Sequence, residues 1–106
     1  MDYTSVITKR LLEARKASGL SQKKLGIAAG IDEFSASPRI NQYERGVHVP
    51  DYGTVERLAS VLNVPTPYFY TRDDDLALLI LRYGQLDVTQ KAEMMKLVDV
   101  ESDKKR

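Results

Sequence analysis

The chain contains no cysteine, no tryptophan and a single histidine among its 106 residues. Without cysteine there is neither a disulfide framework nor a thiolate metal site, and one histidine cannot hold a zinc ion by itself. The acidic run at residues 73–75 is better explained as a helix start, where negative charge is favourable, than as a metal site. We therefore expect no metal and no cofactor.

Long hydrophobic runs are lacking as well. No apolar stretch approaches the roughly 20 residues that a membrane-spanning helix needs, and the N-terminus does not have the basic and then apolar layout of a signal peptide. The sequence shows no glycine-rich phosphate loop, no paired-carboxylate motif and no nucleophile arranged around His48. These absences predict a cytoplasmic protein without a membrane partner, and they make an enzyme the weakest functional hypothesis.

What is present suits one small globular domain with a short appendage. The hydrophobic fraction of 42% and the charged fraction of 29% are ordinary for such a protein. The net charge is only +1, but residues 1–46 hold eight Lys or Arg against five Asp or Glu, whereas residues 47–103 hold five against ten. A random scatter of charge is one explanation. The other is that a polyanion is attracted to the N-terminal part and repelled by the rest.

Two short helices joined by a turn are predicted between Ser21 and Gly46. Ser21 is a helix cap followed by apolar residues at helical spacing, so the first helix is expected over residues 21–29. The dipeptide Ser37-Pro38 predicts the start of the second, over about residues 37–45, because proline loses no hydrogen bond at the first helical position. This second helix has a buried and an outer polar face, with Ile40 and Tyr43 on the first and Arg39 and Gln42 on the second.

Helices are also expected before and after this pair. The first covers Tyr3 to Ser18, with Lys9, Arg10 and Glu13 on its more exposed side. Cap signals predict one further helix from Asp51 to Leu62 and a short one that begins at Thr66-Pro67. Another is expected from the acidic run at residues 73–75 to Gly84, and the last one begins at a capping box formed by Asp87 and Gln90. The last helix is expected to give way to a frayed charged tail at about Val100.

A set of short motifs has a characteristic order and spacing: Gly19-Leu20-Ser21-Gln22, Leu25, the run Ile40 to Gly46, Pro50, Leu58-Ala59, Leu62, Val64-Pro65 and Tyr68-Phe69. Together they resemble the lambda-repressor-like, Xre-type helix-turn-helix family over about residues 5–70. The resemblance implies an all-α fold, with a five-helix DNA-binding domain at residues 1–70 and C-terminal helices at residues 71–106. One departure is the segment Ile31 to Ala36, roughly four residues longer than the tight turn usual in the family.

The resemblance implies that the second helix of the pair is a recognition helix entering the major groove of double-stranded DNA. Arg39 is suited to guanine and Gln42 to adenine. The expected base contacts are Ser37, Arg39, Asn41 and Gln42, and the expected phosphate contacts are Gln22, Lys23, Lys24, Ser35, Arg45 and His48. An ion pair between Arg15 and Glu44 is expected to brace this helix. The alternative for the polar and charged residues in these sets is an ordinary solvated surface.

The C-terminal helices carry more apolar side chains than one helix stripe can hold. Five large aliphatic residues stand within Leu76 to Leu81, so this helix should be covered on more than one side. Its cover is either the last helix, through Ala92, Met95, Leu97 and Val98, or a second copy of the chain. We expect a homodimer contact formed by Leu78, Leu79, Leu81, Met95 and Val98. The alternative is that both helices cap the core of the monomer.

The sequence therefore predicts a sequence-specific DNA-binding transcriptional regulator, a repressor that binds a near-palindromic operator as a homodimer. A protein-interaction module of the antitoxin or adaptor type, acting through the apolar C-terminal helices, is the alternative. The operator sequence, the regulated genes and any inducer leave no trace in the sequence.

Overall fold

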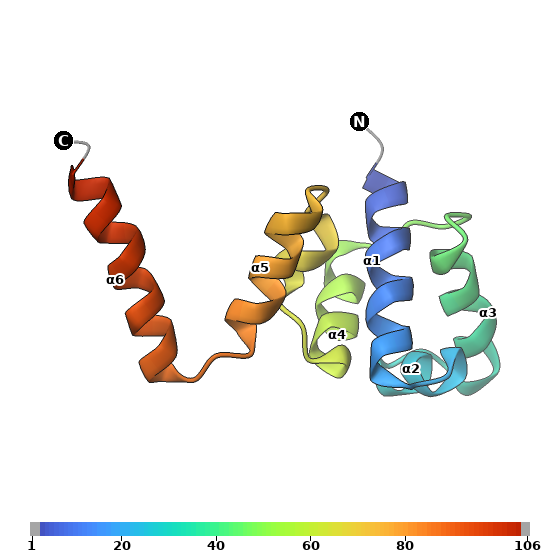
Figure 1. The fold of residues 1–106 in the computed structure, drawn as a ribbon. Helices are drawn as coiled ribbons and strands as arrows, with labels where there is room; N and C mark the ends of the chain where they lie inside the picture. Colours follow the sequence, from blue (N-terminus) through green and yellow to red (C-terminus); the bar gives the residue numbers. More distant parts are fainter. Residues whose placement is uncertain (1–2, 105–106) are drawn as a thin grey trace.

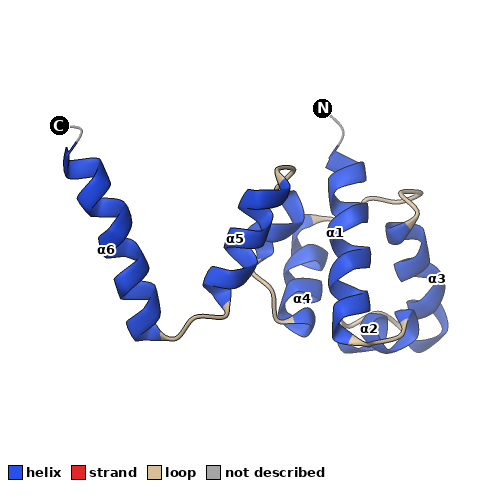
Figure 2. Cartoon of the chain, viewed as in Figure 1, coloured by secondary structure: helices blue, strands red, loops and turns tan. Residues whose placement is uncertain are grey.

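A computed structural model describes residues 3–104, and every regular element in that span is helical (Figures 1 and 2). The first four helices and a short 3₁₀ helix pack together, α5 lies against them, and α6 extends away (Figure 1). The elements are α1 (Tyr3–Ser18), α2 (Gln22–Ala28), α3 (Glu33–Glu44), α4 (Tyr52–Leu62), η1 (Thr66–Tyr70), α5 (Asp74–Gly84) and α6 (Val88–Lys104).

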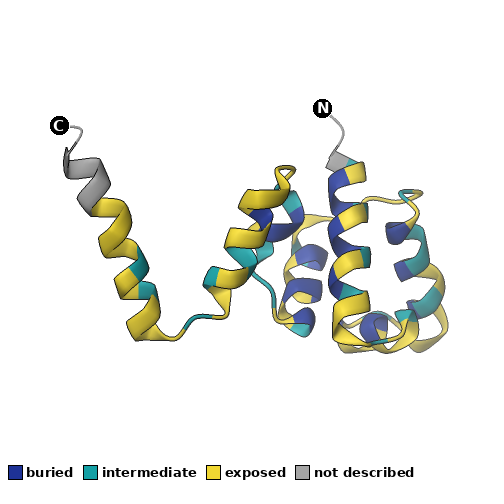
Figure 3. Cartoon of the chain, in the orientation of Figure 1, coloured by how far each residue is buried: buried dark blue, intermediate teal, exposed yellow. Residues whose placement is uncertain are grey.

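The core is formed where α1, α2, α3, α4 and η1 meet. Burial is concentrated in these elements, while α6 is exposed along most of its described length (Figure 3). Because each helix turns one apolar face inward, side chains distant in sequence share one cluster. The largest fully buried side chains are Phe69, Leu11, Leu25, Ile40, Leu58 and Val55.

The turn between α2 and α3 differs from the sequence prediction. Helix α3 begins at Glu33, not at Ser37, and its cap is Asp32, whose carboxylate accepts a hydrogen bond from the Phe34 amide at 3.1 Å. The expected enlarged turn at residues 31–36 is therefore wrong, since four of these six residues belong to the recognition helix. The connection is tight, and α3 is one turn longer at its N-terminal end than predicted.

Close packing of α2 on α3 explains the early helix start. A Cβ atom at Gly26 would lie 2.7 Å from the Ala36 Cβ and 3.0 Å from Ala36 backbone atoms, so only glycine fits at this crossing. Ala36 is fully buried there. The packing of Ala36 against Gly26 is made with Ala36 already in the helix. The tertiary contact therefore determines where α3 begins, and the local cap signal of Ser37-Pro38 does not. Pro38 consequently stands inside α3, exposed, where it removes one hydrogen bond of the helix.

Most other cap predictions are confirmed. Ser21 accepts from the Lys24 amide at 3.0 Å, and Asp51 accepts from the Thr54 amide at 2.8 Å, a bond that lowers the pKa of the Asp51 carboxyl. Asp87 and Gln90 form the reciprocal bonds of a capping box, at 3.0 and 2.7 Å. The exception is Thr66, which lies inside η1, while the cap position is taken by Pro65 and has no side-chain cap bond.

The last helix is longer and less packed than expected. It continues to Lys104 instead of ending at about Val100, and residues 105–106 of the expected tail lie outside the described residues. Its residues Ala92, Met95, Leu97 and Val98 are exposed. The alternative that these side chains pack back and cover the monomer is therefore not seen in this structure.

Candidate nucleic-acid interface

The outer face of α3 is open to solvent. Arg39 is exposed and Gln42 is half-buried, while Ser37 and Asn41, the other two predicted base contacts, are half-buried as well. Helices α5 and α6 form the C-terminal arm, and α6 lies at the opposite end of the molecule from α3, so it does not cover this face (Figure 1). An exposed polar face on a helix of 12 residues has the dimensions that fit a major groove.

A buried ion pair fixes the back of α3 to α1. The Arg15 guanidinium pairs with the Glu44 carboxylate, with Nη2 to Oε1 at 3.0 Å, and Arg15 Nη1 also donates to the Leu20 carbonyl at 3.1 Å. Only 8% of Glu44 is exposed. The hydrogen bond to Glu44 raises the pKa of Arg15. The predicted contact is thus present, and it restrains the C-terminal turn of the recognition helix.

Gln22 belongs to the same network. Its side-chain amide donates to Glu44 Oε1 at 3.0 Å and to Asn41 Oδ1 at 3.3 Å, which joins the start of α2 to α3. Both donors of the side chain are therefore engaged within the protein. The phosphate contact expected of Gln22 stays a prediction, and it requires this side chain to leave Glu44.

The other predicted phosphate ligands lie on the surface. Lys23, Lys24, Ser35, Arg45 and His48 are all exposed. Lys23 Nζ stands 3.9 Å from Glu33 Oε1, an exposed pair that contributes little to stability and leaves the ammonium group accessible. Arg45 is the residue that ends α3. Lys23 thus lies near the N-terminal end of α3, while Arg45 and His48 stand at or just after its C-terminal end, and the phosphate contacts expected of all five residues stay predictions.

Two supporting contacts have no signal in the sequence. Arg57 of α4 donates from Nε to the Ala29 carbonyl at 3.1 Å and from Nη2 to Thr54 Oγ1 at 3.0 Å, so it satisfies a carbonyl at the end of α2. Thr8 of α1 donates to the Tyr43 carbonyl at 3.0 Å in the last turn of α3. Both contacts position the helix pair on the rest of the body.

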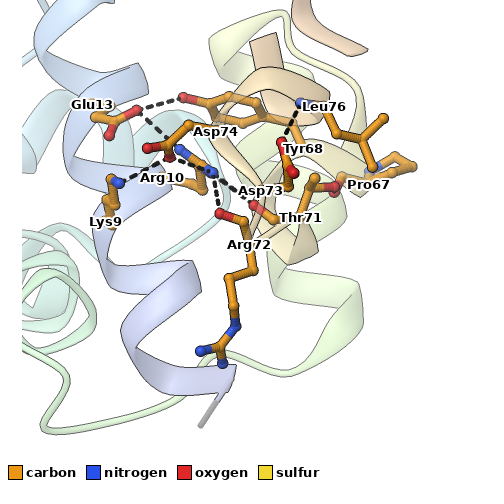
Figure 4. A network of polar contacts seen from close by, with 10 residues as sticks. All are labelled: Lys9, Arg10, Glu13, Pro67, Tyr68, Thr71, Arg72, Asp73, Asp74 and Leu76. Atoms are coloured by element: carbon orange, nitrogen blue, oxygen red, sulfur yellow. Dashed lines mark hydrogen bonds and ion pairs between the residues drawn. The ribbon is translucent and has the colours of Figure 1, made fainter. Parts of the chain in front are cut away.

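Arg10 forms the junction between the helix-turn-helix body and α5 (Figure 4). Its guanidinium donates to the Thr71 carbonyl at 3.0 and 2.8 Å and to the Arg72 carbonyl at 3.1 Å, and it pairs with Asp74 at 3.0 Å. It also lies over the Tyr68 ring, 5.6 Å from the ring centre. Only 3% of Arg10 is exposed. The prediction that it lies on an exposed side of α1 is therefore wrong.

Neighbouring groups complete this junction. Lys9 Nζ pairs with Asp74 at 2.9 Å, and the Tyr68 hydroxyl donates to Glu13 at 3.2 Å. The hydrogen bonds from Lys9 and then Arg10 lower the pKa of Asp74, and burial raises the pKa of Tyr68. Together the contacts fix the start of α5 relative to α1.

An apolar cavity separates α5 from α6. Its volume is about 400 Å³, and it is lined by Pro65, Pro67, Leu79, Ile80, Tyr83, Met94, Met95 and Val98. Three of the predicted dimer residues, Leu79, Met95 and Val98, thus face one space. Leu78 is exposed, but Leu81 is half-buried and packs against the core of its own chain. The dimer contact expected of Leu81 stays a prediction, and only the exposed part of this side chain could make it.

Within residues 3–104, no three His, Asp or Glu side chains gather closely enough to hold a metal ion. In this described part, no helix has the length and apolar character needed to cross a bilayer.

Comparison with known proteins agrees with this geometry. Residues 11–69 match the family model HTH_3, described as helix-turn-helix. The chain is 48% identical to a protein of solved structure, the transcriptional regulator BswR, with a TM-score of 0.82 over 87% of this chain and 91% of that chain. No curated protein matches the chain. The chain therefore belongs to the Xre-type, lambda-repressor-like family of helix-turn-helix DNA-binding transcriptional regulators.

Proposed function

We propose that this regulator is a repressor that binds a near-palindromic operator as a homodimer and reads it with α3. The observation that carries the proposal is the pairing of an open outer face, with Arg39 and Gln42, and a buried brace behind it, formed by Arg15 and Glu44. A rigid helix keeps its side chains in register with successive base pairs. Because α3 is already ordered, binding to DNA does not have to offset the entropy cost of ordering this helix.

Base reading follows from the chemistry of two side chains on the outer face of α3, the exposed Arg39 and the half-buried Gln42. The Arg39 guanidinium offers two donors to the O6 and N7 of guanine, and the Gln42 amide offers one donor and one acceptor to adenine. Each such bidentate contact contributes about 1–3 kcal/mol of discrimination. The Asn41 side chain accepts a hydrogen bond from Gln22 within the protein, and the Ser37 side chain is short, so we assign these two residues a supporting part.

Phosphate contacts supply affinity and salt dependence. Lys24, Arg45 and His48 are exposed near the helix pair, together with Ser35 and with Lys23, whose pairing with Glu33 is weak. Each phosphate neutralised by such a cation releases bound counterions and makes affinity fall with salt. We expect these residues to position α3 without choosing the sequence.

The argument for a homodimer rests on the exposed apolar side chains of the C-terminal arm. Helix α6 carries exposed Met95, Leu97 and Val98, and Leu78 and Leu79 are exposed on α5. A monomer in water rarely leaves so much apolar surface uncovered, which favours an interface here. A second copy of the same arm is the natural cover, because a two-fold dimer of this fold places two reading helices on half-sites about one helical turn apart.

The experiment is a selection of bound duplexes from a random pool, carried out at two salt concentrations. We expect an enriched motif with two related halves, retained at the higher salt concentration. Replacing both reading residues, Arg39→Ala with Gln42→Ala, should abolish the enrichment while the protein stays folded. Arg82→Ala is the matched control, since it removes a cation from α5, away from α3. A pool that enriches no motif would overturn the proposal.

A protein-interaction module remains the second candidate, and the apolar cavity between α5 and α6 favours it. It predicts that changes at Leu78 and Leu79 abolish function while Arg39→Ala does not. Sedimentation at micromolar concentration separates the two proposals further. A strict monomer there would remove the homodimer and leave the arm available for a different partner.

A further inference from the structure

The first turn of α3 carries an aromatic ring in solvent. Phe34 is 88% exposed, the most exposed of the large hydrophobic side chains in the described residues. It is the second residue of the helix and it lies in the segment that the sequence assigns to a loop. Burial of an apolar ring against another surface is favourable, because it removes the ring from water. The position of the ring decides which surface that is.

Phe34 is continuous with the reading face. In an α-helix, residues three or four positions apart share a face, so Phe34, Pro38 and Gln42 follow one row, and Ser35 and Arg39 follow the adjacent row. Phe34, Ser35, Pro38 and Arg39 are all exposed. The ring therefore extends the outer face of α3 toward its N-terminus. In this class of motif, the N-terminal residues of the recognition helix contact base edges.

The backbone and the charges around Phe34 do not form a phosphate clamp, so the phosphate contact proposed for this turn is that of the Ser35 hydroxyl on the adjacent row. The Phe34 amide is already bound by the Asp32 carboxylate at 3.1 Å, and the next carboxylate, Glu33, stands 3.9 Å from Lys23. Two carboxylates at the helix start repel the anionic backbone of a duplex. What this turn offers to DNA is an apolar surface, and a base edge is the part of DNA that accepts one.

We propose that Phe34 is a specificity-determining residue that contacts the C5-methyl group of a thymine in the major groove. Thymine is the standard base that presents an apolar group there, and phenylalanine is one of the side chains that contact it. Five helical positions separate Phe34 from Arg39, a distance of about 7.5 Å along the axis. The thymine thus lies about two base pairs from the base that Arg39 reads. This inference rests on the proposed sequence-specific binding.

The test uses duplexes selected by the wild-type protein, in which each thymine is replaced in turn by uracil. This change removes one methyl group and leaves every hydrogen-bonding atom in place. At one thymine in each half-site, we expect wild-type affinity to fall about fourfold, the effect of one buried methyl group. With Phe34→Ala, the same replacement should change the affinity less than about 1.5-fold, because the methyl group has lost its partner. Phe34→Leu should retain part of the sensitivity.

Gln42→Ala is the matched control on the same face. It should weaken binding but keep the fourfold sensitivity to the thymine methyl group. In thermal unfolding, the melting temperature of Phe34→Ala should stay within about 4 °C of the wild type, because the ring is exposed. If no thymine is sensitive, or if Phe34→Ala keeps the sensitivity, this inference is overturned and the proposed function stands. If the wild type enriches no motif from the pool, both are overturned.

Discussion

The helix-turn-helix body and the C-terminal arm are built from similar apolar residues but use them differently. In the body, Leu11, Leu25 and Leu58 are fully buried, and their helices are held by a buried ion pair and by Arg10. In the arm, Leu79 is 51% exposed and Leu97 is 68% exposed. The difference indicates that contacts within one chain stabilise the body, whereas the apolar side chains of the arm are left largely uncovered by their own chain.

The same comparison assigns different sensitivities to the two regions. Substitutions in the body should change the free energy of unfolding of the monomer, because they disturb contacts that a single chain makes. Substitutions on the exposed side of the arm should change the assembly and leave monomer folding nearly intact. The following predictions test that division.

The largest loss in the free energy of unfolding is expected from a substitution at Glu44. In Glu44→Ala the Arg15 guanidinium loses its partner, and breaking a largely buried pair in this way costs about 3–5 kcal/mol. Glu33→Ala is the control, since its pair with Lys23 is exposed and should contribute at most about 1 kcal/mol. Urea unfolding of both variants, followed by circular dichroism, measures the two costs. Equal costs would show that the ion pair is not what holds α3.

Arg10→Ala should have the next largest effect. The variant loses the hydrogen bonds from the Arg10 guanidinium to the Thr71 and Arg72 carbonyls. A hydrogen bond that involves a charged group contributes about 1.5–3 kcal/mol to the free energy of unfolding. Lys9→Ala is the matched control, because Lys9 reaches the same Asp74 carboxylate from an exposed position and should contribute less than about 1 kcal/mol. Urea unfolding at neutral pH compares them, and a Lys9 effect as large as that of Arg10 would contradict the assignment of the junction.

Gly26→Ala should lower stability although alanine is the better helix former. The added Cβ would stand 2.7 Å from the Ala36 Cβ, and overpacking of this kind costs about 1–3 kcal/mol. Gly53→Ala in α4 is the control, since its Cβ would meet nothing closer than 3.7 Å. That variant should be unchanged or more stable by up to about 1 kcal/mol. Thermal unfolding of the pair gives the sign of each change.

The features that the sequence predicts correctly are those determined by neighbouring residues. The caps at Ser21 and Asp51 and the capping box at Asp87 depend on side chains within three positions, so they can be read directly. Residues 37–44 of α3 are helical as expected, because apolar and polar positions recur there at helical spacing, and the predicted last residue, Arg45, is the cap that follows the helix. The family motifs also place the Arg15 and Glu44 pair.

The errors concern contacts between distant residues. The start of α3 depends on Ala36 packing against Gly26, which a local cap signal at Ser37 does not reveal. The burial of Arg10 depends on a carbonyl 61 positions later, at Thr71. The exposed position of Phe34 on α3 was not predicted for the same reason, because a residue assigned to a loop has no predicted helix face. Locating α3 correctly is what brings its ring onto the reading surface.

The smallest effect on monomer folding is expected at Leu79, which sharpens the comparison between body and arm. Leu79 is half exposed beside the apolar cavity, so Leu79→Asp should change the free energy of unfolding of the monomer by about 0.5 kcal/mol or less. A dimer would bury two added carboxylates without partners, so association should be lost. Sedimentation measures the assembly, and thermal unfolding of the dissociated chain measures the fold.

Leu81→Asp is the matched control for that prediction, because Leu81 is two positions away on the same helix but packs against the core of its own chain. It should destabilise the monomer itself, since a charge is placed against the core without a partner. If Leu79→Asp instead unfolds the monomer as readily as Leu81→Asp, the arm belongs to the body's own folding unit. If Leu79→Asp leaves the dimer intact, the two copies meet through a different surface, and the cavity between α5 and α6 is not where they associate.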